Sequence, residues 1–147
     1  MKILDVGCGA NKTEGAIGLD NNPRTNADVI HDLGELPYTF PDNEFELVVS
    51  NHVVEHVPDV KSFLEKIDSM NAGDIILTVP DAVQCARRHF EYQEQGEEFI
   101  EIVHPDHNCW YTPYTIKNTI TKYTSWKIDG LWFFNNISIL AVINKQR

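Results

Sequence analysis

Short apolar runs, several of them rich in β-branched residues, alternate with polar loops through the first 80 residues of the chain. Runs that end in polar or glycine-containing sequence are typical of buried strands in a mostly parallel sheet. The pattern predicts strands at residues 3–6, 16–19, 29–31, 45–50 and 75–79. In such a sheet the carboxyl ends of the strands form the ligand crevice, so the polar residues that follow each run are candidates for function.

Two later segments have the spacing of amphipathic helices. Residues 60–67 place apolar side chains at positions i, i+3, i+4 and i+7 after Asp59, which predicts a helix capped by that aspartate. Residues 116–123 form a second apolar stripe after Thr112 and Pro113, an N-cap followed by proline at the first helical position. Both helices are expected to cover the sheet.

The last two strands are expected to pair with each other. Residues 126–134 and 137–143 flank Asn135 and Asn136 and predict an antiparallel hairpin. Together these elements predict an α/β fold of the Rossmann-like, doubly wound type, with a mostly parallel sheet and a C-terminal antiparallel hairpin. The length of 147 residues is that of one domain, expected to span residues 1–147.

Composition and charge narrow the function classes. The chain has 12 basic and 22 acidic side chains and a formal charge of −10, which argues against a nucleic-acid partner, because binding a phosphate backbone requires clustered Lys and Arg. Three cysteines without a CxxC pair fit neither a disulfide framework nor a zinc site, and they favour a reduced, cytoplasmic setting. No apolar run approaches the ~18 residues of a membrane-spanning helix, so neither a membrane span nor an export signal is expected.

The loop after the first predicted strand has the composition of a nucleotide-binding turn. Gly7 and Gly9 allow a tight turn and a close approach to a ligand. A dinucleotide site would need a third glycine at Lys12 and an acidic residue ~20 residues on, whereas Asp20 follows Gly7 by 13, and this mismatch argues against NAD or FAD. Only seven residues separate Gly9 from Ile17, fewer than the ~10–12 of a usual crossover, so the first crossover helix is expected to be shortened or absent.

Four sequence runs occur in an order typical of one enzyme family. They are LDVGCG at residues 4–9, IGLD at 17–20, ADVIHDL at 27–33 and PDNEFELVVSNHVVEHV at 41–57. In this order they resemble the class I S-adenosylmethionine-dependent methyltransferases, particularly the small-molecule, methyltransferase type 11-like kind. The resemblance implies S-adenosylmethionine as the cofactor and methyl transfer by in-line displacement to a small-molecule, sugar or lipid-linked acceptor.

The resemblance assigns the polar residues at the strand ends to parts of the cofactor. Residues 5–9 would line its methionine end, Asp20 would accept both ribose hydroxyls, and Asp32 would take the adenine amino group. Lys12 would reach the cofactor's carboxylate or remain a solvated side chain; alternatively, Asp5 and Asp20 only satisfy loop amides. The full set of expected cofactor-binding residues is Asp5, Gly7, Cys8, Gly9, Lys12, Asp20, Asn21, Asp32, Leu33, Asn51 and His52.

Histidines are the main candidates for a general base. Methyl transfer needs a base only when the acceptor is a poor nucleophile such as a hydroxyl. His52 comes directly after the fourth predicted strand and is the first candidate. The others are His56 and His107, together with Glu55 and His104. The cluster at residues 104–107 has ligand-type side chains but no partner elsewhere in the sequence, so no metal site is expected.

The sequence leaves two further questions open. The shortened first crossover is also consistent with a pseudoenzyme that binds the cofactor without transferring a methyl group, or with an interaction protein. A nucleic-acid methyltransferase and a nicotinamide enzyme rank below this alternative. The absence of the first crossover helix and of preceding helices is expected to leave the pocket open on one side, which motivates the hypothesis of a homodimer.

Overall fold

The computed structural model describes residues 1–32, 40–84, 111–134 and 138–144. In this part of the chain, seven strands form one sheet, accompanied by two α-helices of 11 residues, a short 3-10 helix and helical residues at 82–84. The elements are β1 (Ile3–Val6), β2 (Ile17–Asp20), β3 (Val29–Ile30), β4 (Phe45–Asn51), η1 (Val54–His56), α1 (Val60–Met70), β5 (Asn71–Pro80), α3 (Pro113–Tyr123), β6 (Lys127–Phe134) and β7 (Ser138–Asn144).

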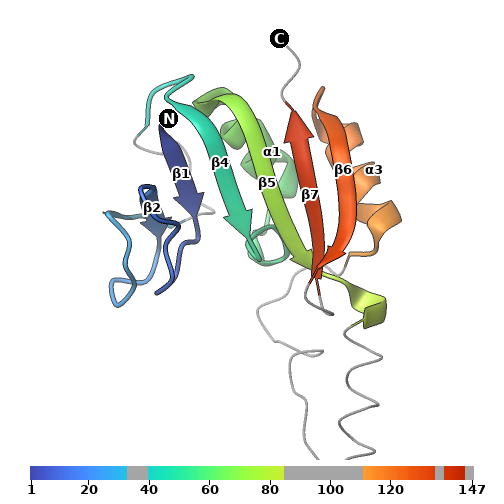
Figure 1. Cartoon of the computed structure of the whole chain (residues 1–147), viewed down its shortest axis with the longest axis horizontal. Coiled ribbons are helices and arrows are strands. Elements are labelled where there is room, and N and C mark those ends of the chain that lie inside the picture. The colour runs from blue at the N-terminus through green and yellow to red at the C-terminus, as the bar shows by residue number, and fades with distance from the viewer. Residues whose placement is uncertain (33–39, 85–110, 135–137, 145–147) are drawn as a thin grey trace, which may run out of the picture.

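The strand order of the sheet is β3-β2-β1-β4-β5-β7-β6 (Figure 1). Strands β1 to β5 pair in parallel, and β7 lies antiparallel between β5 and β6. The predicted α/β fold with a doubly wound, mostly parallel sheet and a C-terminal antiparallel hairpin is therefore confirmed. The order reverses between β1 and β4, and in such sheets ligands bind at the carboxyl ends of the strands beside this switch point.

One face of the sheet packs against both helices. Side chains alternate between the two faces of a strand, and the register aligns Val48, Ile75 and Ile143 on this face. All three are buried in one core cluster with Phe63 of α1 and Ile116 of α3. Figure 1 shows the two helices on the same side of the sheet. The apolar stripes that predicted α1 and α3 thus face the core.

The two predicted N-caps are also present. Asp59 accepts hydrogen bonds from the N–H of Ser62 at 3.1 Å and from its hydroxyl at 2.7 Å. Thr112 and Thr115 form a capping box in which each side chain satisfies the other residue's backbone N–H. Both α1 and α3 have 11 residues, and none of the described helices is long and apolar enough to cross a membrane.

The opposite side of the sheet has an apolar centre but no helix over it among the described elements (Figure 1). The register aligns Val49, Ile76 and Val142 across β4, β5 and β7, and all three are half-buried. Trp132 of β6 pairs with Leu140 on the same side and is 54% exposed. We call this surface the open face. It comprises Leu47, Val49, Ile76, Trp132, Leu140 and Val142.

Strands β1 and β2 are connected without a helix. Residues 7–16, all of them described, form turns and bends. The prediction of a shortened or absent first crossover helix is confirmed. A loop of this length has to be held by side-chain contacts, because it lacks the regular backbone hydrogen bonds of a helix.

Candidate functional site

β1 ends in a tight glycine turn at the switch point of the sheet. Gly7 and Gly9 have φ angles of +67° and +56°, which residues with a Cβ rarely adopt. The N–H groups of Gly7 and Cys8 both donate to the carbonyl oxygen of Leu19, at 2.7 and 3.3 Å. The turn is therefore tied to the carboxyl end of β2.

Asp20, the last residue of β2, connects the glycine turn to the loop that follows β2. Its Oδ2 accepts the N–H of Gly9 at 3.0 Å, and its Oδ1 accepts the N–H of Asn22 at 3.0 Å. A carboxylate has about four lone-pair positions, so each oxygen can accept one more donor. Because Asp20 is only half-buried, this acceptor capacity suits two neighbouring hydroxyl groups of a ligand.

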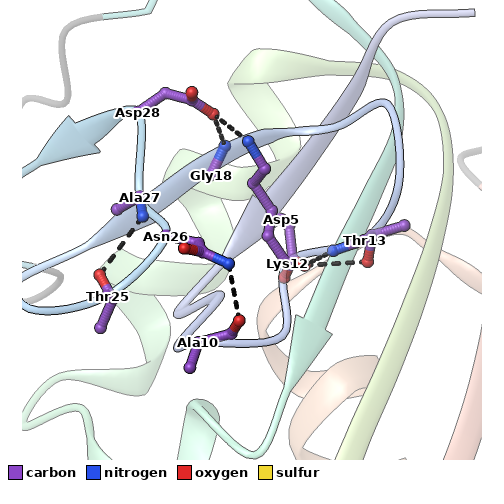
Figure 2. Close-up of polar contacts among 9 residues, drawn as sticks. All are labelled: Asp5, Ala10, Lys12, Thr13, Gly18, Thr25, Asn26, Ala27 and Asp28. Carbon is purple, nitrogen blue, oxygen red and sulfur yellow. Dashed lines mark hydrogen bonds and ion pairs between the residues drawn. The ribbon is translucent and has the colours of Figure 1, made fainter.

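Asp5 of β1 lies beneath the loop and is 4% exposed. Its Oδ2 accepts both the N–H and the hydroxyl of Thr13, each at 2.8 Å (Figure 2). Asp5 and Asp20 thus both satisfy loop donors, as the alternative interpretation of these residues proposed. This role does not compete with ligand binding, since an ionised carboxylate keeps further acceptor positions.

Lys12 is paired with Asp28, the residue directly before β3. Its Nζ lies 2.8 Å from Oδ2 of Asp28, and the same oxygen accepts the N–H of Gly18 at 2.8 Å (Figure 2). The hydrogen bond from Gly18, followed by that from Lys12, holds the pKa of Asp28 below its usual range. The structure therefore places the ammonium group of Lys12 against a carboxylate of the protein itself.

The carboxyl end of β4 carries Asn51 and His52. His52 has a φ of +54°, and its N–H donates to the carbonyl oxygen of Thr78 at 3.0 Å. Its Nε2 lies 2.7 Å from the hydroxyl oxygen of Ser138, at the start of β7. The hydroxyl of Thr78 in turn donates to Oδ1 of Asn51. These contacts fix the imidazole of His52 beside the carboxyl end of β5 and the amino end of β7.

A pocket opens between the glycine turn and the strands β4 and β5. Of the expected cofactor-binding residues, it brings together Asp5, Gly7, Cys8 and Asn51. Burial, assisted by the negative charges of Asp5 and Asp20, raises the pKa of the Cys8 thiol. Cys8 is therefore a neutral packing group in the pocket wall.

The remaining expected residues lie elsewhere. Asn21 and Asp32 are exposed residues that follow β2 and β3, and Gly9 and Asp20 hold the outer side of the glycine turn. The positions of Leu33, His104 and His107 fall outside the described residues.

The 3-10 helix η1 contains the second candidate base and a buried carboxyl group. Nε2 of His56 lies 3.5 Å from Oε1 of Glu55. Glu55 is 1% exposed, and neither of its oxygens has a hydrogen-bond partner among the described residues. Desolvation raises the pKa of Glu55 to about 7. Its carboxyl group is thus partly protonated at neutral pH.

Several lining residues were not predicted from the sequence. The pocket also includes Asn11, Thr13, Val49, Ser50, Ile76 and Thr78. A local signal exists for Ser50 and Thr78, which are polar residues in otherwise apolar runs. Val49 and Ile76 also belong to the open face, so the pocket lining continues into that face.

The described residues offer no set of metal ligands. Within residues 1–32, 40–84, 111–134 and 138–144, no three His, Cys, Asp or Glu side chains come together as a candidate metal site. The polar groups of the pocket are carboxylates, amides, hydroxyls and main-chain groups, which suit an organic ligand with hydroxyl and amino groups.

Comparisons with known proteins bear on this arrangement. A family model described as a methyltransferase domain matches residues 1–123, and no curated protein matches the chain. Among solved structures, a Pyrococcus horikoshii protein is similar over 99% of this chain and 82% of its own, with a TM-score of 0.73 and 17% identity.

Two solved S-adenosylmethionine-dependent methyltransferases are similar as well. The Mesorhizobium loti enzyme has a TM-score of 0.69 and 14% identity, over 98% of this chain and 90% of its own. The Archaeoglobus fulgidus enzyme has a TM-score of 0.67 and 16% identity, over 98% of this chain and 86% of its own. At such identities these structures support the fold, while the family model reaches from β1 through α3.

Proposed function

Since this chain belongs to the methyltransferase-domain family, we propose that it transfers a methyl group from S-adenosylmethionine to a small-molecule, sugar or lipid-linked acceptor. S-adenosylmethionine is the cofactor of the family. The observation that carries the proposal is the position of Asp5, the glycine turn and Asp20 at the carboxyl ends of β1 and β2, beside a pocket shared with β4 and β5.

The residues at this site fit the cofactor. Asp5 is a buried carboxylate in the pocket wall and suits the positive charge of the ammonium or sulfonium group. Asp20 keeps acceptor positions for the two ribose hydroxyls, and Asn21 follows it on the exposed side. The main chain at Gly7 and Gly9 allows close approach. Asp32, two residues after the end of β3, would take the adenine amino group.

The chemistry makes modest demands on the protein. When bound, the cofactor supplies a methyl carbon activated by its positively charged sulfur, and the acceptor displaces that sulfur in line. The chain's part is to orient the two reactants and to exclude water. For a hydroxyl acceptor, a protein base must also take the proton that the acceptor loses as its oxygen bonds to the methyl carbon.

We assign the base to His52. Its main chain is fixed by Thr78, and its Nε2 is held by Ser138, so the ring has a defined position at the end of β4. Asn51, its neighbour in sequence, lines the pocket. His56 is the second candidate and lies against Glu55. His107 is the third.

Calorimetry with S-adenosylhomocysteine tests the proposal. The wild-type chain is expected to bind it in the micromolar range. Asp20→Asn should weaken binding about tenfold or more, because a charge-assisted acceptor of two hydroxyls is lost. Asp42→Asn is the matched control, since Asp42 is an exposed carboxylate shortly before the amino end of β4, whereas the candidate site lies at the carboxyl ends of the strands.

Three results would count against parts of the proposal. A wild-type chain that binds neither S-adenosylmethionine nor S-adenosylhomocysteine contradicts it altogether. Equal affinities of Asp20→Asn and wild type contradict the assignment of the ribose site. Cofactor binding without methyl transfer to a broad panel of acceptors supports the pseudoenzyme alternative.

We also propose that a second copy of the chain covers the open face. An isologous dimer pairs one surface with itself, and the open face is an apolar surface on four neighbouring strands that suits such pairing. The exposed sides of α1 and α3 carry polar residues such as Lys61, Glu65 and Lys117 and do not complement it. Because Val49 and Ile76 also line the pocket, the second copy would close the pocket on this side.

The remaining partner and location proposals rest on charge and composition. A formal charge of −10 supports an acceptor other than nucleic acid, because a polyanion would be repelled. The cysteine pattern supports a cytoplasmic location.

A further inference from the structure

The loop of residues 7–16 replaces a crossover helix, and a few contacts from β1, β2 and the β2–β3 connection hold it. Thr13 is bound to Asp5 (Figure 2). Asn26 donates its backbone N–H to the carbonyl of Gly9 at 3.1 Å and its side-chain amide to that of Ala10 at 2.7 Å. Lys12 also forms an ion pair with Asp28, with its Nζ 2.8 Å from Oδ2.

Asp28 is well placed to hold both the loop and β2. One carboxylate oxygen, Oδ2, accepts the ammonium of Lys12 and the N–H of Gly18, each at 2.8 Å. The N–H of Asp28 also donates to the carbonyl oxygen of Gly18 at 2.9 Å. The backbone of β2 therefore holds the carboxylate of Asp28 in a fixed position, and the ammonium group of Lys12 binds to that carboxylate.

The stem of Lys12 also lies directly on β2. A Cβ at Gly18 would lie 2.7 Å from Cδ of Lys12 and 2.8 Å from Sγ of Cys8. Both side chains thus pack onto the strand where only glycine leaves room for them. Cys8 lines the pocket, so Lys12 packs on the same glycine as a residue of the pocket wall.

We propose that Lys12 and Asp28 are positioning residues whose ion pair holds the loop of residues 7–16 across β2 and so presets the glycine turn for the cofactor. Lys12 then acts through Asp28 and does not itself contact the cofactor's carboxylate. The inference rests on the proposed function, since the object that is positioned is the cofactor site.

The test uses two substitutions that remove the charges and keep the shapes. Lys12→Met retains an unbranched stem over Gly18, and Asp28→Asn retains an oxygen acceptor for the N–H of Gly18. The double variant completes a thermodynamic cycle. Two quantities are measured on each chain: affinity for S-adenosylhomocysteine by calorimetry, and amide hydrogen exchange of residues 7–18 without ligand. Lys61→Met, Glu65→Gln and their double variant form the control cycle, because that ion pair joins two exposed residues of α1.

Each single variant is expected to weaken S-adenosylhomocysteine binding about fivefold and to speed exchange in the loop. The double variant should be no worse than either single one, because both remove the same contact. The control cycle should change neither quantity. A loss of affinity in Lys12→Met with none in Asp28→Asn would overturn the proposal in favour of direct cofactor contact. Wild-type affinity and exchange in both variants would overturn it as well.

The exchange measurement separates this inference from the proposed function. If the wild-type chain binds no S-adenosylhomocysteine, the proposed function fails, and the apo protein still reports on the ion pair. Faster exchange of residues 7–18 in both single variants then supports the loop-holding role. Unchanged exchange overturns it.

Discussion

Glu55 is a buried carboxyl group whose charge state changes near neutral pH. Its pKa is raised from 4.5 to about 7 by desolvation. The folded protein therefore keeps this proton at pH values where the unfolded chain has lost it. Between pH 4.5 and 7 the unfolded chain binds fewer protons, so the free energy of unfolding must fall as the pH rises through this window.

Urea unfolding across this pH range measures the effect. Relative to Glu55→Gln, which cannot ionise, the wild-type chain should lose up to about 3 kcal/mol of stability between pH 4.5 and pH 8. Glu65→Gln, at an exposed position of α1, is the control and should keep the wild-type pH dependence. Parallel stability curves for Glu55→Gln and wild type would show that Glu55 is ionised in the folded state.

His52 provides the residue-scale test of the chemistry. His52→Gln should lower kcat by about 100-fold for a hydroxyl acceptor, because no side chain then accepts the proton that the hydroxyl loses in the transition state. Affinity for S-adenosylhomocysteine should change little, which separates loss of chemistry from loss of the site. His56→Gln is the matched comparison, and a larger loss of kcat in that variant would move the role of base to His56.

The sequence predicts which residues come together where a strand end positions them. Asp5, Gly7, Cys8 and Asn51 were expected together, and the register of β1 with β4 brings them to one pocket. Contacts that depend on the path of a loop or on strand order were not predictable. Lys12 and Asp28 are 16 residues apart and meet only because the loop crosses β2.

The contact between His52 and Ser138 was likewise not predictable from the sequence, because it joins residues that are far apart in the chain. The two residues are 86 positions apart in the chain. They meet because β7 enters the sheet between β5 and β6 and begins beside the carboxyl end of β5. No periodicity or motif near Ser138 signals this position.

At the scale of elements, α3 depends on the capping box at its start. Thr115 donates its N–H to the hydroxyl of Thr112 at 3.3 Å, and Thr112 donates its N–H to the hydroxyl of Thr115 at 2.8 Å. Thr112→Ala should lower the free energy of unfolding by about 1 kcal/mol in urea titrations. The control is Thr121→Ala on the exposed side of α3, expected within about 0.5 kcal/mol of wild type, because its hydroxyl only bonds back to carbonyls of the same helix. Equal losses of unfolding free energy in Thr112→Ala and Thr121→Ala would show that the capping box does not stabilise α3 more than an ordinary threonine on its surface.

Element types were predictable because apolar spacing separates strands from helices, whereas element ends depend on contacts between distant segments. The fifth strand was expected at residues 75–79 and runs from Asn71 to Pro80. Its early start depends on Asn71, whose side chain bonds the N–H and carbonyl of Gly73. It also depends on Gly73, where a Cβ would lie 1.8 Å from the carbonyl oxygen of Glu46. Neither residue has a strong strand preference, so pairing with β4 decides the boundary.

At the scale of the whole molecule, the two faces of the sheet differ in how far the described helices cover them. The helix-covered face is completed by α1 and α3 within the chain. The open face has half-buried apolar side chains on β4, β5 and β7, and the described elements place no helix over it. Aligned apolar surfaces of this kind usually mark an interface on a folded protein. The open face also borders the candidate cofactor site, so whatever packs on it is expected to affect activity as well as assembly.

Two exposed aromatic residues of β6 allow a matched test of the proposed dimer. Trp132 is 54% exposed and lies on the open face, with its indole over Gly130. Its neighbour Phe133 is 64% exposed and points to the other side of the sheet, since it pairs with Ile139. Both lie on an edge strand, where a charged replacement is compatible with folding.

Light scattering coupled to size exclusion gives the oligomeric state of each variant. The wild-type chain should be a dimer at micromolar concentration. Trp132→Glu should weaken the dimer about tenfold or more, because it places a charge inside an apolar interface. Phe133→Glu should remain dimeric, since its side chain lies on the face that the helices cover. A monomeric wild-type chain at high concentration would reject the second copy as the cover of the open face. Dissociation by both substitutions would instead place the contact at the β6 edge, because that edge is what the two side chains share.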